Sequence, residues 1–175
     1  VQTEEVKSAG RKVSSLEEFL HIAKEDFHEA YRIFTERHFS LILSDQSEKI
    51  RSLYAGMSQQ PVTYQHLEEF LIAAGAKEKV TLSLNREEAG FYDVSESVQE
   101  SLYIHRSGWG HLRADIEVNG DFLEAGKHVV TEEDFIGSTC EINYVIRQEK
   151  LGKGNQYGEI IVKTPYQKLV YHVLA

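Results

Sequence analysis

The spacing of apolar residues changes along the chain and divides it into two parts. From Leu16 to Phe34, apolar residues recur every three or four positions, which is the spacing of one buried helix face. Ser14 and Ser15 are each followed three positions later by a glutamate, a pattern typical of a capped helix start. These positions predict a helix over 16–37 with a break near Asp26.

Three further helices are expected before residue 76, over 39–43, 46–57 and 64–74. Pro61 separates the last two, because proline lacks a backbone N–H and clashes with the preceding turn. Gly75 follows the final helix at the position where a left-handed backbone is common. The pattern therefore predicts a small helical bundle over 14–75, preceded by a disordered tail or linker over 1–13.

After Gly75 the apolar period becomes two. Residues 112–118 and 140–146 alternate apolar and polar side chains, as half-buried strands do, and Asn119-Gly120 is typical of a tight turn. Several short strands with no helices between them indicate an antiparallel β-sandwich over 76–175, and the fold class is α+β. The other expected strands cover 80–84, 101–105, 122–123, 128–130, 159–163 and 168–174.

Composition and charge exclude several partners. The net charge is −9, and no cluster of Lys and Arg provides the positive face that nucleic acid requires. No run of about 18 apolar residues exists, which argues against membrane insertion. Cys140 is the single cysteine, so an internal disulfide is excluded, and its place in an alternating strand predicts a buried thiol. Without an export signal we expect a cytoplasmic protein, with the cell surface as the alternative.

Residue spacing does not favour catalysis, a metal or a cofactor. The eight histidines include no pair at the i, i+4 spacing of helical zinc sites. The carboxylates of 132–134 are adjacent in sequence, whereas glycoside hydrolysis needs two carboxyls facing each other across a cleft. The glycine-rich segment 152–155 joins two expected strands, so it is interpreted as a hairpin loop rather than a phosphate-binding loop. We therefore expect no enzyme activity.

Aromatic residues are the remaining candidates for binding. Trp109 lies between two glycines, which would leave its ring open to a ligand or to a protein partner. The alternative is that Trp109 packs in the sandwich core or against the helices. The candidate binding residues are Trp109, Tyr103, His111 and Tyr157.

Two resemblances extend this interpretation. Segments 122–123, 131–135 and 151–164 resemble bacterial immunoglobulin-like modules, which implies an immunoglobulin-like sandwich. The segments Ser107–Gly110, Asn119–Leu123 and Glu132–Gly137 are similar to part of a family of large uncharacterised clostridial proteins, known only as a domain of unknown function. That likeness covers about residues 15–175 and implies no catalytic residue.

The function expected from the sequence is a non-catalytic structural or protein-interaction module. The first residue is not Met, so we expect the chain to be a piece of a longer protein. Its partner would then be a protein or a neighbouring domain of that protein. A carbohydrate-binding module that uses exposed aromatic rings around Trp109 is the alternative.

Overall fold

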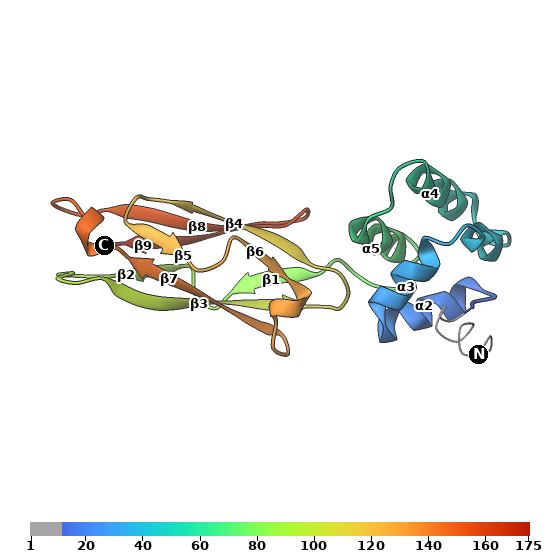
Figure 1. Cartoon of the computed structure of the whole chain (residues 1–175), viewed down its shortest axis with the longest axis horizontal. Coiled ribbons are helices and arrows are strands. Elements are labelled where there is room, and N and C mark those ends of the chain that lie inside the picture. The colour runs from blue at the N-terminus through green and yellow to red at the C-terminus, as the bar shows by residue number, and fades with distance from the viewer. Residues whose placement is uncertain (1–11) are drawn as a thin grey trace, which may run out of the picture. The chain divides into compact units, whose positions relative to one another are not determined.

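A computed structural model describes residues 12–175, and they form an α+β protein with helices first and strands second (Figure 1). The described residues divide into two compact units, each with its own hydrophobic core. The helical unit comprises the residues up to Lys79 together with Trp109–His111. The sandwich unit comprises Val80–Gly108 and Leu112–Ala175. The expected tail over 1–13 lies almost entirely outside the described residues.

The helical unit confirms the helix positions expected from the sequence, including the break at Asp26. Asp26 ends the first helix in an extended conformation, and its side chain accepts a hydrogen bond from the Glu29 N–H at the start of the second. The segment expected as a second helix is a 3₁₀ helix. The elements are α2 (Leu16–Glu25), α3 (Phe27–Phe34), η1 (Phe39–Leu43), α4 (Glu48–Ser58) and α5 (Tyr64–Ala73).

A cluster of aromatic rings fills the centre of the helical unit. The ring of Phe19 meets that of Phe39 edge to face at 4.7 Å, and Phe34 lies 5.2 Å from Phe70. All four side chains are buried. The four rings come from α2, α3, η1 and α5. The cluster therefore joins segments that are far apart in sequence, since Phe19 and Phe70 are 51 positions apart.

The sandwich unit contains two sheets. The four-stranded sheet has the order β1-β3-β7-β5, and the five-stranded sheet has the order β2-β9-β8-β4-β6. The strands are β1 (Thr81–Leu84), β2 (Glu88–Gly90), β3 (Val98–Ser107), β4 (Arg113–Asn119), β5 (Leu123–Ala125), β6 (Val129–Thr131), β7 (Thr139–Ile146), β8 (Tyr157–Lys163) and β9 (Lys168–Leu174). Short 3₁₀ helices, η2 (Glu132–Asp134) and η3 (Gln148–Lys150), precede and follow β7.

The fully antiparallel sandwich expected from the sequence is wrong at one edge. Strand β2 pairs with β9 in parallel, so the five-stranded sheet is mixed. The sequence gives no sign of β2, because Glu88-Ala89-Gly90 is too short and too polar to alternate visibly. The other strand pairs are antiparallel among the described residues.

Both sheets contribute to one core. Ile104 and Ile142 come from the four-stranded sheet, and Ile116 and Val162 come from the five-stranded sheet. On β4 the buried residues alternate with exposed ones, as the sequence predicts. Cys140 is also buried in this core, and its burial raises the pKa of the thiol, so the expected buried thiol is confirmed.

A pair of tyrosines joins the sheets through the core. The hydroxyls of Tyr144 on β7 and Tyr171 on β9 lie 2.8 Å apart, and both side chains are fully buried. Burial and this hydrogen bond both raise the pKa of Tyr144. Desolvation lowers the pKa of Arg86, but the two tyrosines and Glu100 outweigh it and leave that pKa raised.

The glycine at 158 allows β8 to pack closely. A Cβ there would lie 2.9 Å from the Asn119 carbonyl oxygen and 2.9 Å from Phe122 Cζ. Replacing Gly158 by alanine should therefore lower the free energy of unfolding of the sandwich unit by about 1–3 kcal/mol. Urea unfolding followed by circular dichroism would measure this.

The matched control is Gly56→Ala in α4, where no atom beyond the adjacent residues and the helix's own backbone lies within 4 Å of the added Cβ. Alanine is the better helix former, so this change should stabilise the helical unit by about 1 kcal/mol. An unchanged free energy of unfolding in the Gly158→Ala variant would contradict the packing described for β8.

Candidate functional site

A groove on the outer face of the five-stranded sheet is the candidate site. Its volume is about 960 Å³, near the upper end of the range of about 300–1,000 Å³ typical of small-molecule sites. Residues of β2, β8 and β9 line it, together with the turn that follows β4. The lining side chains used below are Arg86, Glu88, Tyr92, Asn119, Tyr157, Glu159 and His172.

Strand register places these side chains in rows. On β9, Tyr171 and Val173 are buried, so His172 and Leu174 face outward. His172 pairs with Glu159 on β8 and with Glu88 on β2, and Glu159 in turn pairs with Asn119. The first row, across four strands, is Glu88, His172, Glu159 and Asn119.

The second row contains the aromatic residues. Leu174 on β9 pairs with Tyr157 on one side and with Gly90 on the other. The phenol of Tyr92 lies against Gly90, since a Cβ at Gly90 would be 3.1 Å from its hydroxyl. Tyr92 and Tyr157 are 79% and 75% exposed, so both tyrosines are available to a ligand.

A buried polar cluster in the helical unit is the second arrangement that needs a functional interpretation. Lys77 forms an ion pair with Glu68, each side chain being 1% exposed, and it also donates to the Trp109 carbonyl oxygen. The His111 N–H donates to the other Glu68 oxygen at 3.2 Å. Burial raises the pKa of Glu68, and Lys77 opposes that shift most strongly. The cluster holds the backbone of Trp109–His111.

Gly110 is needed within that segment. Its φ is +100°, and a Cβ would lie 2.6 Å from Lys77 Nζ and 2.8 Å from the Glu68 carboxylate. A ligand has no room there, because the charged atoms already contact the glycine. We interpret the cluster as structural.

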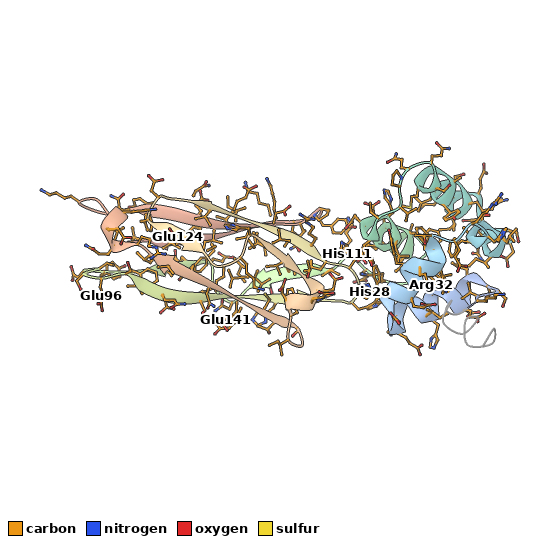
Figure 2. The ribbon with its side chains drawn as sticks, viewed as in Figure 1. His28, Arg32, Glu96, His111, Glu124 and Glu141 are labelled. Atoms are coloured by element: carbon orange, nitrogen blue, oxygen red, sulfur yellow. The ribbon has the colours of Figure 1, made fainter. Side chains whose placement is uncertain are left out.

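The structure separates the four binding residues expected from the sequence. Trp109 is half-buried against the core of the helical unit, with Lys77 Nζ 5.0 Å from its ring centroid. His111 stacks on Tyr64 at 5.6 Å (Figure 2, where His111 is labelled). Tyr103 lies on β3 in the four-stranded sheet, and Tyr157 lines the groove.

Most of the groove was missed by sequence reasoning. Tyr92, Glu88 and Arg86 lie on or beside β2, a strand that the apolar pattern does not reveal. His172 could have been found as the polar residue between Tyr171 and Val173, and Glu159 as the polar residue before the apolar run of β8. Their meeting with Glu88 could not, because it depends on parallel pairing at the sheet edge.

The acidic segment 132–134 has structural contacts. Glu132 accepts from the Leu112 N–H at 3.1 Å, and Asp134 accepts from the Thr131 N–H at 2.8 Å. Hydrogen bonding from Lys127 is the main cause that lowers the pKa of Asp134.

Among residues 12–175, no group of three or more His, Cys, Asp and Glu side chains could hold a metal ion. No helix in the same range is long and apolar enough to cross a membrane.

The fold and the groove define an α+β protein whose β-sandwich carries a cavity of ligand size. The chain belongs to a family of unknown function (DUF5717), and residues 1–175 match the N-terminal region of that family. No curated protein matches the chain.

Two solved structures share a partial likeness. The PapD-like domain 7 of human CEP192 is 8% identical with a TM-score of 0.40, and the match covers 53% of this chain and 82% of that one. A FixG-related protein from Vibrio parahaemolyticus is 14% identical with a TM-score of 0.36, covering 56% of this chain and 94% of that one. With both TM-scores below 0.5, these likenesses assign neither a fold nor a function to the chain.

Replacing Lys77 by methionine tests the buried cluster. The change leaves the Glu68 carboxylate buried without its cation, which should cost about 3–5 kcal/mol of unfolding free energy. The pKa of Glu68 should rise further, so the folded state binds its proton more tightly than the unfolded chain does. Stability should then fall as pH rises above the ordinary pKa of a glutamate, about 4, until the raised pKa of Glu68 is passed. Urea unfolding followed by fluorescence of Trp109, the single tryptophan, measures both effects in the helical unit.

The control is the double variant Glu68→Gln with Lys77→Met. The neutral amide can still accept from the His111 N–H, so the double variant should recover stability and lose the added pH dependence. A Lys77→Met variant as stable as the unmodified chain at every pH would refute the structural role of the pair.

Proposed function

We propose that the chain is a non-catalytic interaction module of a longer protein. One observation carries this proposal: among residues 12–175, the three most exposed large hydrophobic side chains, Ile136, Tyr92 and Tyr157, all lie on the sandwich unit. Ile136 is 90% exposed. Exposed apolar and aromatic side chains are typical of surfaces that a partner protein covers, and aromatic residues are enriched at such interfaces.

The perturbed titratable groups support a role in binding rather than turnover. Catalytic sites usually gather groups whose pKa values are shifted by burial. Burial raises the pKa values of Tyr54, Glu68, Cys140 and Tyr144, and none of these residues lines the groove. Arg86 does line the groove, and its raised pKa keeps the guanidinium charged, which suits binding rather than proton transfer. The description of the matching family region as N-terminal supports membership of a longer protein.

The sandwich is proposed to be immunoglobulin-like. Immunoglobulin-type sheets have the strand orders ABED and CFG. With β1, β3, β4, β5, β7, β8 and β9 as strands A to G, the observed orders β1-β3-β7-β5 and β9-β8-β4 reproduce both sheets. Strands β2 and β6 are then additions at the two edges of the second sheet. This topology supports the resemblance seen in the sequence.

A protein or a neighbouring domain is the proposed partner, and Ile136 is the proposed contact. Ile136 begins a tight hairpin that closes on Thr139, with Gly137 in a left-handed conformation between them. The hairpin thus displays an isoleucine at a turn, where packing within the unit does not require it. An apolar residue at such a place is suited to a pocket on a protein surface.

Photo-crosslinking tests the protein contact. With p-benzoylphenylalanine in place of Ile136 in the full-length protein, ultraviolet light should produce one discrete protein adduct. The same probe in place of Glu141, an exposed residue of β7 labelled in Figure 2, should not. Excess unlabelled chain should suppress the adduct, whereas an Ile136→Asp chain should not.

Two results would count against the proposed contact. One is equal labelling from both positions, which would show random collision. The other is an adduct that Ile136→Asp competes away as well as the unmodified chain does. A steady turnover of any substrate by the isolated chain would refute the non-catalytic assignment.

A further inference from the structure

The groove presents two exposed tyrosines, Tyr92 and Tyr157, along one row of its lining. Tyr92 rests on Gly90, and Gly90, Leu174 and Tyr157 form one row across three adjacent strands. Two strand spacings of about 4.8 Å put Gly90 and Tyr157 about 10 Å apart. Because both rings are more than 70% exposed, they offer two stacking surfaces on either side of Leu174.

A row of polar side chains runs beside the rings. Glu88, His172, Glu159 and Asn119 succeed one another on adjacent strands of the same sheet face. Carboxylates accept hydrogen bonds, while imidazole and amide groups can both donate and accept. The groove therefore combines apolar faces in one row with several hydrogen-bonding groups in the next.

This combination matches the chemistry of a sugar. A pyranose has apolar C–H faces, which are attracted to the electron-rich face of an aromatic ring, and an edge of hydroxyls that donate and accept. Gly90, against which Tyr92 lies, and Tyr157 are about 10 Å apart, so a ligand that contacts both tyrosines must be longer than a single ring. The volume of about 960 Å³ accommodates such a ligand.

Charge restricts the ligand further. Glu88 and Glu159 would repel an anionic ligand from the centre of the polar row. Arg86, which lies in the wall of the groove and forms an ion pair with Glu100 at 3.7 Å, adds a positive charge that weakens the attraction for a cationic peptide. An uncharged ligand with many hydroxyls fits both constraints.

We infer that the groove binds a neutral oligosaccharide, with Tyr92 and Tyr157 stacking on its sugar rings and Glu88, His172, Glu159 and Asn119 bonding its hydroxyls. The inference rests on the proposed function, since it takes the chain to be a binding module. It assigns the sugar to the sandwich groove rather than to the surroundings of Trp109.

The experiment uses the purified chain on an array of neutral and acidic glycans, printed beside a library of basic peptides. Binding to neutral glycans is expected, and the strongest of them is then titrated by calorimetry. Tyr92→Ala and Tyr157→Ala should each weaken its binding by at least tenfold. Both rings are largely exposed, so thermal unfolding should show little change in either variant.

Tyr103→Ala is the matched control, because Tyr103 is a partly exposed tyrosine on the other sheet. Its affinity should stay within twofold of that of the unmodified chain. Binding to basic peptides or acidic glycans in preference to neutral glycans would overturn the inference. So would an absence of glycan binding, or glycan binding that survives the loss of both groove tyrosines.

Failure of this inference and failure of the protein contact can be told apart. The crosslink from position 136 does not involve the groove, so it should persist in the Tyr92→Ala and Tyr157→Ala variants. Loss of glycan binding with an intact crosslink would reject the sugar alone and leave the interaction module standing.

Discussion

The hydrogen bond between the buried hydroxyls of Tyr144 and Tyr171 joins the two sheets of the sandwich unit and requires Tyr171 to face the core. A strand that slips by one residue exchanges its inward and outward faces. With Tyr171 bonded in the core, His172 and Leu174 must face outward, where they form the floor of the groove. The inward face of β9 therefore decides which of its residues fill the core and which ones a ligand meets.

The helical unit combines an apolar core with a buried ion pair. Aromatic rings fill the core, and Glu68 and Lys77 are buried and paired with each other in the same unit. Such a pair adds little net stability compared with apolar residues, but it demands specific partners. The pair bonds to the carbonyl of Trp109 and the N–H of His111, and it leaves no room for a side chain at Gly110. It therefore favours one backbone path over 109–111.

Local patterns predicted the elements better than they predicted the site. Amphipathic spacing and capping side chains located the helices, including the break at Asp26, because those signals act over a few residues. The alternation on β4 and β7 was equally visible. Strand β2 was not, since its three residues gain their structure only from pairing with β9, more than 80 residues later. Tyr157 was recognised as a candidate, whereas its relation to Tyr92 arises from that same distant pairing. The buried position of Glu68 likewise follows from a partner whose proximity no local spacing indicates.

The parallel pairing of β2 with β9 also has a mechanical consequence. Tension drawn along the chain from the start of β2 to the end of β9 would pull these strands in opposite directions along their length. The hydrogen bonds from the His172 N–H to the Glu87 carbonyl and from the Phe91 N–H to the Leu174 carbonyl would then bear the load at the same time, rather than breaking one after another. A strand of only three residues would in this way help to set the force at which the sandwich yields.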